Sequence, residues 1–356
     1  MTIFISVVAF LVIIILAILV HETGHFITAK LSGVKVEEFG IGLPPRIWGF
    51  TKGETIYSVN WIPLGGFCRM AGEVDPGVPR SLASKNIKTR LLVLSAGSLF
   101  MLLFPLFLLP ASYMTPISRP AEDAGVLIES VTAGSPAEAV GLEVEDVILK
   151  VDGQAVNTLD DLRQAIEPKR GSEVILLLSR GGMEFEQTII PRTEEKTPEG
   201  EGAMGIVMEP VMEVTSYPPW EAIPRGLGDY GGIFTGLGTA FGQLFRGEVN
   251  LNDALTGPIG IGHLTSIFVE RGTEQMIRFT VVIFILMGIF NLLPIPGLDG
   301  GHLLFIAIEG ARRGKRISPQ KEGFIHLVGF ALLLGLVVAV SYNDILRLIQ
   351  GKGFGP

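Results

Sequence analysis

Four apolar stretches divide the chain, and each has the composition of a membrane-spanning helix. The first occupies residues 3–20, where Ser6 is the only polar interruption. The others occupy residues 91–114, 279–293 and 324–342. Because roughly 20 helical residues cross the hydrocarbon layer of a bilayer, the pattern predicts four spanning helices. No basic segment precedes the first stretch and no small-residue cleavage pattern follows it, so we expect a retained helix and not a cleaved signal peptide.

A glycine- and proline-rich segment lies between the first two stretches, at residues 34–70. It contains short runs typical of β-strands, such as residues 56–61 (Ile-Tyr-Ser-Val-Asn-Trp). The segment is too short for a domain, so we expect membrane-associated β-hairpins beside the first spanning helix; a surface loop is the alternative. An open strand edge here can pair with an extended peptide. Residues 1–120 are therefore expected to form the N-terminal half of a membrane core.

Residues 121–195 have the pattern of a small α+β domain inserted between the second and third spans. The pattern predicts strands at 125–128 and 146–153, helices at 135–142 and 159–166, and a hairpin at 174–190. The segments Ala-Gly-Ser-Pro-Ala, Gly-Leu and Asp-Gly follow one another at intervals that resemble those of a PDZ domain of the bacterial protease type. The fold class expected for the whole chain is therefore a polytopic α-helical membrane protein with a PDZ-like insertion.

The segment after this domain, residues 196–275, is expected to contain a linker and an interfacial amphipathic segment. Residues 193–202 are rich in Glu, Lys, Pro and Gly, which is the composition of a linker. Residues 220–245 mix apolar side chains with many glycines, so an interfacial helix, a span and a plain loop all remain open. Residues 276–356 then complete the membrane core.

Composition agrees with this organisation. The chain is 48% hydrophobic and only 18% charged, which excludes an ordinary soluble domain and favours a lipid bilayer as its surroundings. A nucleic-acid partner is not expected. The single cysteine, Cys68, permits no internal disulfide and excludes a zinc site built on thiolates, so any metal here must be bound by His and carboxylate side chains.

The distribution of charge predicts the orientation in the membrane. Residues 121–214 contain 20 acidic and 7 basic side chains, whereas the rest of the chain contains 16 acidic and 21 basic ones. The basic residues cluster in the loops between spans one and two and between spans three and four. By the positive-inside rule both loops face the cytoplasm, so the PDZ-like domain and both termini are expected to lie outside the cytoplasmic membrane.

The first span ends in His21-Glu22-Thr23-Gly24-His25. Residues four apart project from one face of a helix, so His21 and His25 can share a divalent ion. Glu22 is then placed to take a proton from the attacking water, as in zinc hydrolases that carry this motif. The alternative is a polar helix end at the membrane surface, but ionisable groups beside a span are costly and usually functional.

The third span is interrupted by residues 291–301 (Asn-Leu-Leu-Pro-Ile-Pro-Gly-Leu-Asp-Gly-Gly). Irregular backbone at membrane depth is tolerated only where protein or a water-filled cavity surrounds it, so this stretch is predicted to be a pocket wall. Its carboxylate, Asp299, is the natural third metal ligand. Two His, one Asp and a water make a tetrahedral catalytic zinc site with one open position.

The two motifs, with a PDZ-like domain between them, resemble the site-2 protease family of intramembrane zinc metalloproteases, in particular its bacterial regulator-of-sigma-factor branch. Leu-Gly-Gly-Phe at 64–67 and Gly-Pro-Ile-Gly-Ile at 257–261 extend the resemblance over essentially the whole chain. It implies that His21, His25 and Asp299 bind Zn²⁺, and that Glu22 is the catalytic base. It further implies that Asn291, with Pro294 and Pro296, binds the substrate. A well-known enterobacterial member has two PDZ domains, whereas this chain has room for one.

The resemblance implies an endopeptidase that cleaves single-pass membrane proteins, such as anti-sigma factors already trimmed by an upstream site-1-type protease, or remnant signal peptides. Two other classes stay open: a non-catalytic zinc-binding membrane scaffold, against which the intact Glu22 argues, and a metal transporter. For the PDZ-like domain we expect a size filter, with binding of a newly exposed C-terminal tail as the alternative. His302 can support a ligand, although a structural role is favoured, and His263 and His326 have no partner motif.

Overall fold

The computed structural model describes residues 2–198, 200–249 and 255–351. The chain divides into two compact units. The first, here called the membrane unit, consists of Met1–Thr115 and Tyr217–Pro356, and the second, the inserted domain, consists of Pro116–Ser216. Parts of the expected linker and interfacial segment, at 199 and 250–254, lie outside the described residues, as do the two ends of the chain at 1 and 352–356.

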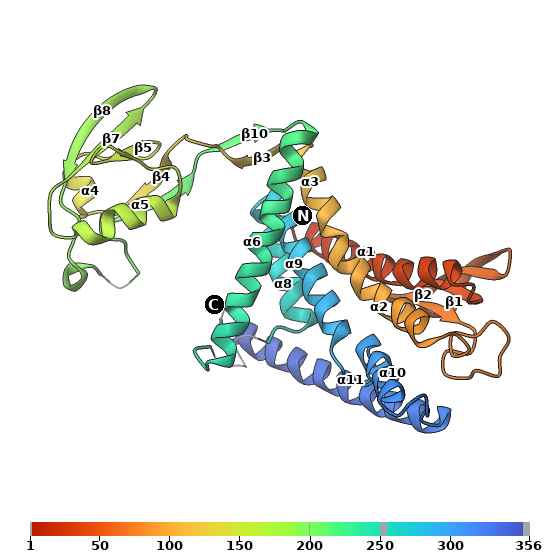
Figure 1. Cartoon of the computed structure of the whole chain (residues 1–356). Coiled ribbons are helices and arrows are strands. Elements are labelled where there is room, and N and C mark those ends of the chain that lie inside the picture. The colour runs from red at the N-terminus through yellow and green to blue at the C-terminus, as the bar shows by residue number, and fades with distance from the viewer. Residues whose placement is uncertain (1, 199, 250–254, 352–356) are drawn as a thin grey trace. The chain divides into compact units, whose positions relative to one another are not determined.

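The membrane unit is built from helices and one two-stranded sheet (Figure 1). Its elements in chain order are α1 (Thr2–Leu31), β1 (Val36–Lys52), β2 (Thr55–Met70), α2 (Ile87–Leu103), α3 (Pro105–Tyr113), α6 (Pro219–Phe245), α8 (Pro258–Glu270), α9 (Thr273–Leu292), α10 (Asp299–Ala311) and α11 (Pro319–Ile349).

Four helical stretches in the described part of the chain are long and apolar enough to cross a membrane, which confirms the predicted number. They are Phe4–Leu31, Ile87–Tyr113, Thr273–Leu292 and Pro319–Ile349. The second contains a break between α2 and α3, because Pro105 has no N–H to continue the helical hydrogen bonding. Helices continue beyond the apolar runs at several ends, since polar residues at a helix end remain helical once they leave the lipid.

Three of these helices meet in one small apolar cluster. Ala17 of α1, Met101 of α2 and Phe284 of α9 are fully buried against one another. The α1–α2 crossing is close: a side chain on Gly24 would come within 2.5 Å of the Ala96 carbonyl oxygen. Glycine at this position therefore lets the backbone of α2 approach the helix turn that carries the histidines.

The hairpin folds back on itself beside α1. The first part of β1, near Phe39, pairs both with the beginning of β2 and with its end, so the two strands form a twisted meander. Its base is anchored in an apolar core shared with α1 and α2, which includes Ala29, Val36, Cys68 and Val93. The predicted β-structure at 34–70 is thus present as a hairpin packed on the helix that ends the first span.

The segment 220–245 forms the long helix α6, so a plain loop is excluded there. Gly226 lies against α3, where a side chain would come within 2.5 Å of the Pro110 nitrogen. The Tyr230 hydroxyl donates a hydrogen bond of 2.9 Å to the Leu102 carbonyl. These contacts hold α6 on α3 within the membrane unit.

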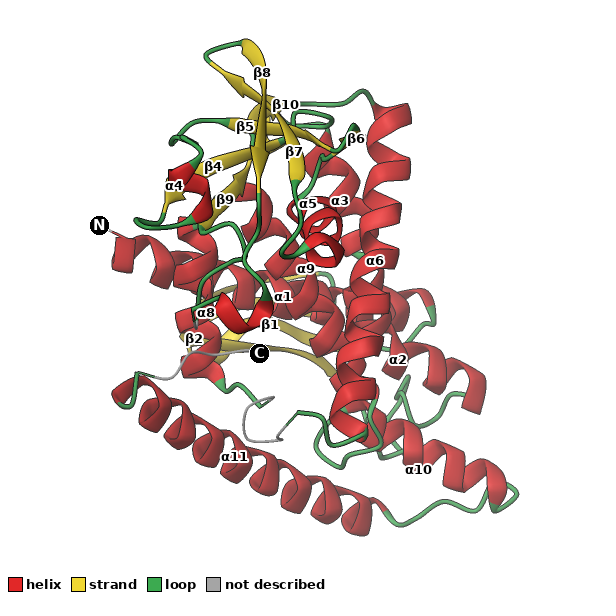
Figure 2. Cartoon of the chain, turned by 90° about the vertical axis from the view of Figure 1, so that its left-hand side faces the viewer, coloured by secondary structure: helices red, strands yellow, loops and turns green. Residues whose placement is uncertain are grey.

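The inserted domain contains one main antiparallel sheet with strand order β8-β7-β5-β4-β9, and β6 pairs with β5 (Figure 2). A short ladder of β3 with β10 joins the two ends of the domain. The elements in chain order are β3 (Ile117–Pro120), β4 (Val126–Val131), α4 (Pro136–Ala139), β5 (Val147–Val151), β6 (Gln154–Ala155), α5 (Leu159–Ile166), β7 (Val174–Arg180), β8 (Met183–Ile189), β9 (Ile206–Pro210) and β10 (Met212–Thr215).

The inserted domain is larger than the range 121–195 expected from the sequence. The strand β9, which falls in the segment 196–275 expected to contain a linker and an interfacial amphipathic segment, pairs along β4 from Ile206 to Pro210. Ala203, Met204 and Ile206 are buried in the core of the domain. Long-range strand pairing decides this boundary, whereas the Glu- and Pro-rich composition before β9 indicated only that the chain leaves the hairpin.

An ion pair with a buried carboxylate holds two elements of the inserted domain together. Asp146 is completely buried, which by itself disfavours its charged form. Two hydrogen bonds of 2.6 and 2.8 Å from Arg180, and one of 2.8 Å from the Glu143 N–H, outweigh that cost. They lower the pKa of Asp146 below its usual value, so the carboxylate stays charged and links the start of β5 to the end of β7.

Candidate metal centre

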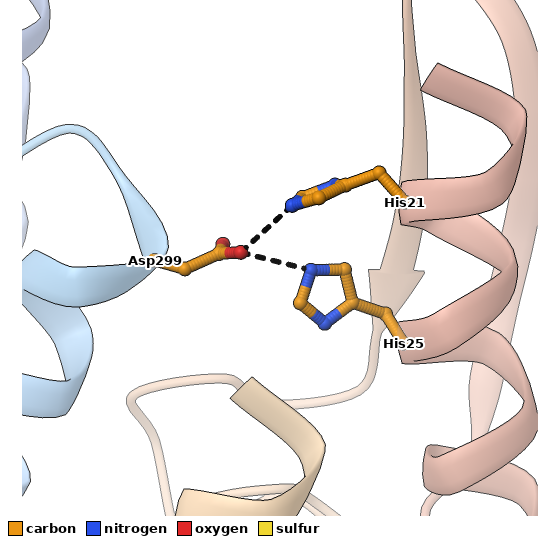
Figure 3. A group of neighbouring side chains, drawn as sticks. All are labelled: His21, His25 and Asp299. Atoms are coloured by element: carbon orange, nitrogen blue, oxygen red, sulfur yellow. Dashed lines mark hydrogen bonds and ion pairs between the residues drawn. The ribbon is translucent and has the colours of Figure 1, made fainter. Parts of the chain in front are cut away.

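The histidines of the first span and the carboxylate after the third converge at one point. His21 and His25 project from one face of α1, and their rings lie edge to face with centroids 4.8 Å apart. Asp299, the first residue of α10, faces both (Figure 3). Its Oδ2 atom lies 2.9 Å from His21 Nε2 and 3.2 Å from His25 Nε2. Asp299 thus forms one cluster with two histidines that lie 274 or more positions earlier in the chain.

The spacing of these atoms fits a tetrahedral zinc ion. Ligand atoms at about 2.0–2.1 Å from zinc are about 3.3 Å from one another at the corners of a tetrahedron. The two distances between Asp299 and the histidines are close to that value. All three ligand atoms lie within 4.8 Å of one another. His21, His25 and Asp299 therefore can hold one divalent ion and leave a fourth position open.

A backbone carbonyl orients the second histidine for this role. The Nδ1 atom of His25 is 2.9 Å from the carbonyl oxygen of Val93 in α2. Because a carbonyl can only accept, Nδ1 carries the proton and donates it, which leaves the lone pair of Nε2 directed at Asp299. Histidine ligands of metals usually have such a partner on the other ring nitrogen. No sequence pattern could point to Val93, since any residue supplies a carbonyl.

A glycine of α2 forms the floor of the cluster. A Cβ atom on Gly97 would overlap His25 Nε2 and would lie 2.7 Å from His21 Nε2. The space that the two nitrogens face is therefore available only because this residue has no side chain. Gly97 was not recognised in the sequence, where a single glycine in an apolar helix has no distinguishing pattern.

Glu22 lies at the edge of the same cluster. Its Oε1 atom is 3.4 Å from His21 Nδ1, and its side chain is only 15% exposed. Gly66, from the Leu-Gly-Gly-Phe segment, faces it: a Cβ there would lie 3.4 Å from Glu22 Cγ and 2.6 Å from Ile18 Cγ2. The missing side chain of Gly66 thus lets the end of β2 lie against the helix turn that carries the carboxylate.

A tight connection between α9 and α10 sets the position of Asp299. A side chain on Gly300 would overlap the carbonyl oxygens of Leu292 and Leu293, so α10 starts directly against the end of α9. Gly297 has φ of 100°, a conformation that favours glycine. The glycines of the Leu-Asp-Gly-Gly sequence are what allow a new helix to begin at this point.

The three predicted substrate-binding residues precede Asp299 in the chain. The structure shows no contact between them and the two histidines. The Asn291 amide donates a hydrogen bond of 3.0 Å to the Met287 carbonyl within α9. Pro294 is exposed, whereas Pro296 is partly buried and lies against Gly329 of α11. The role of these three residues stays a prediction.

An apolar cavity opens beside the cluster, between α1 and α2. Its volume is about 380 Å³, and its lining includes Leu19, Val20 and Thr23 of α1, Phe100 and Leu103 of α2, and Phe104 between α2 and α3. Thr23 directly follows Glu22 in α1. Apolar side chains therefore have a place to bind within one helix turn of the carboxylate.

Comparison with known proteins places this site in a family. The profile described as Peptidase family M50 matches residues 9–336. A Clostridium perfringens protein named as a candidate zinc metalloprotease is 34% identical over 330 residues, covering 92% of this chain and 95% of that protein. "Zinc metalloprotease RasP" of Geobacillus kaustophilus is 29% identical over 426 residues, covering 96% and 97%.

A solved structure, the PDZ domain of an SdrC-like protein from Listeria monocytogenes, is 26% identical and covers 25% of this chain and 92% of that one, with a TM-score of 0.22. The profile and the relatives, in contrast, extend over nearly the whole chain, including both halves of the His and Asp cluster. The chain therefore belongs to peptidase family M50, and it is a zinc metalloprotease with membrane-spanning helices.

Proposed function

We propose that the protein is an intramembrane endopeptidase that cleaves single-pass membrane proteins within or beside their spanning helix. The observation that carries this proposal is that Asp299 of α10 meets His21 and His25 of the apolar helix α1. By resemblance, the substrates are anti-sigma factors already trimmed outside by a site-1-type protease, or remnant signal peptides. The cavity lined by apolar side chains of α1 and α2 supports an apolar substrate.

The residues of the cluster divide the chemistry among them. A zinc ion held by His21, His25 and Asp299 supplies Lewis acidity for the scissile carbonyl and the attacking water. Glu22 takes the proton of that water as it attacks the carbonyl carbon. The same carboxyl group then gives the proton to the leaving amine nitrogen as the peptide bond breaks. His25, held by the Val93 carbonyl, keeps its Nε2 atom available throughout.

The hairpin is proposed to bind the substrate backbone. A peptide bond inside a helix is shielded by its own hydrogen bonds, so cleavage requires local unwinding, and the freed groups need partners in lipid. The end of β2, near Gly66, pairs with β1 on one side and lies against the turn of α1 that carries Glu22. An extended substrate strand beside it would recover backbone hydrogen bonds next to the catalytic carboxylate. Asn291, Pro294 and Pro296 would contact the same strand.

Orientation is part of the proposal. The basic loops between spans one and two and between spans three and four support an active site on the cytoplasmic side of a bacterial cytoplasmic membrane, with the inserted domain and both termini outside. Residues 121–214 of that domain contain only 7 basic side chains, which agrees with an outside location.

Metal removal tests the function. The purified full-length protein in detergent should cleave a tagged transmembrane substrate, stop when zinc is stripped with a chelator, and recover when zinc is added. Asp299→Ala should lose both zinc and cleavage, because two histidines alone bind zinc weakly. Zinc binding without cleavage would support the scaffold, and zinc flux across vesicles would support a transporter. Cleavage that persists in the metal-free protein would rule out the mechanism.

For the inserted domain we propose a PDZ-like size filter that excludes substrates with bulky outer parts. One observation favours the alternative, a tail-binding site. Within the described residues, β9 is an edge strand of the main sheet, and a groove of about 520 Å³ lies between it and α5. Its lining includes Leu162, Ile166, Gly202 and Met208. An extended tail can add to the edge of β9 there.

A groove variant and a deletion separate the two roles. Gly202→Trp should fill the groove, since the nearest atom to its Cβ position is Ile206 O at 4.0 Å; Gly202→Ala is the matched control. A filter predicts normal cleavage of trimmed substrates by Gly202→Trp, and cleavage of untrimmed ones after deletion of residues 116–216. Docking predicts that Gly202→Trp and the deletion both slow the processing of trimmed substrates, while Gly202→Ala does not.

A further inference from the structure

The loop that carries Asp299 is fixed by one face of α11. The backbone N–H of Gly297 donates a hydrogen bond of 3.0 Å to Nδ1 of His326. One turn further along α11, Gly329 lies so close to the loop that a Cβ there would overlap the Pro296 carbonyl. Next to it, the backbone of Phe330 would be 2.8 Å from a Cβ on Gly297. Positions 326, 329 and 330 of α11 thus contact Pro296 and Gly297, which precede Asp299 in the loop.

His326 also contacts α10 on the other side of Asp299. His302, one helical turn after Asp299, stacks on His326 with ring centroids 3.7 Å apart and planes 13° apart. Nδ1 of His302 in turn lies 3.7 Å from a carboxylate oxygen of Glu322, one turn before His326 on α11. His326 therefore touches the chain both two residues before Asp299 and three residues after it (Figures 1 and 2 show α10 and α11).

The chemistry of this contact requires an acceptor at one atom. A backbone N–H can only donate, so Nδ1 of His326 is unprotonated, and the proton of a neutral ring is on Nε2. Nε2 is buried and has no hydrogen-bond partner among the described residues. A buried polar atom without a partner costs free energy, so packing alone would favour an apolar side chain here. An imidazole at this buried position points to a requirement for its acceptor.

His302, Glu322 and His326 are close enough to one another to be considered as a second metal site. The ring geometry argues against it. Lone pairs lie in the plane of an imidazole, so those of two nearly parallel, stacked rings do not converge on one ion. The stack instead brings a flat surface of His326 against α10.

We propose that His326 is a positioning residue that holds Asp299 in place for zinc, through the N–H of Gly297 and the stacked ring of His302. This inference rests on the ligand role proposed for Asp299. It connects α11, the least buried of the four candidate spanning helices, to the geometry of the metal centre.

Zinc affinity of the metal-stripped full-length protein in detergent tests this role. His326→Phe keeps a flat ring but removes the acceptor, and it should weaken zinc binding about tenfold, within the range found for partners of metal ligands. His326→Asn restores an acceptor near the position of Nδ1 and should bind zinc within about threefold of wild type. Gly323→Ala, in open space one turn earlier on α11, is the control and should bind zinc as wild type does.

Zinc affinity is measured by competition titration. The melting temperature of the metal-free protein is measured beside it and should be the same in all variants. Equal zinc affinity of His326→Phe and wild type, or equally weak binding by the Phe and Asn variants, would overturn the inference. So would two zinc ions per wild-type chain with one lost in His326→Phe. Asp299→Ala in the same titration separates the two proposals: if it binds zinc normally, the ligand assignment itself is wrong.

Discussion

Replacing Glu22 by Gln is expected to lower the rate of substrate cleavage by on the order of 10³–10⁴-fold, the upper part of the range for a general base. Gln has nearly the same shape but cannot take a proton from water. Because Glu22 faces His21 Nδ1, away from the Nε2 atom that faces Asp299, zinc binding should be unchanged. Single-turnover cleavage of a tagged transmembrane substrate and zinc content per chain measure the two effects.

The matched control for this variant is Glu270→Gln. Glu270 is exposed at the end of α8, so the same chemical change there should leave cleavage and zinc content at the wild-type level. Wild-type turnover by Glu22→Gln would remove Glu22 from the mechanism. Loss of zinc in that variant would make the carboxylate a support of the metal centre and not its base.

Replacing Gly97 by Ala is expected to weaken zinc binding on the order of 100-fold, the upper end of the range for groups around a metal. The added Cβ would overlap His25 Nε2 and come within 2.7 Å of His21 Nε2, so the two rings must shift or α1 and α2 must separate, and either change disturbs the ligand geometry. Alanine is a better helix former than glycine, so α2 itself should remain helical. Zinc affinity by competition, with cleavage measured at saturating zinc, reports the effect.

Gly335→Ala is the control for that change, since a Cβ at this position of α11 meets no atom within 4 Å. It should bind zinc and cleave substrate as wild type does. If Gly97→Ala also behaved as wild type, α2 would not form the floor of the metal centre, and the close crossing of α1 and α2 at Gly24 would need to be revised.

The hydrophobic pattern was sufficient to predict the four spanning helices of the membrane unit. Uninterrupted apolar runs must be helical in lipid, because only a helix satisfies its own backbone, so the number of spans could be predicted. The helical period likewise predicted that His21 and His25 share a face. Inside the inserted domain, local signals also worked: Thr158 and Asp161 form a capping box where α5 was expected to begin.

Strand pairings between distant segments were harder to predict from the sequence. The edge strand β9 was not expected, and its residues fell in the segment 196–275 assigned to a linker and an interfacial segment. They pair with β4, about 80 positions earlier, and no local pattern reports that partner. The hairpin was expected, but its return alongside its own first strand was not. Hydrogen bonds between strands depend on register and twist, which are properties of the pair and not of either sequence.

The sequence alone determined which side chains can do the chemistry: two imidazoles one helical turn apart, a carboxylate between them, and an Asp at a break in a later span. Tertiary structure decided how they are held. The Val93 carbonyl, the missing side chain of Gly97 and the imidazole of His326 act through positions in space, from α2 and α11. A residue type encodes a functional group, but the distance and direction between groups on separate helices arise only when those helices pack.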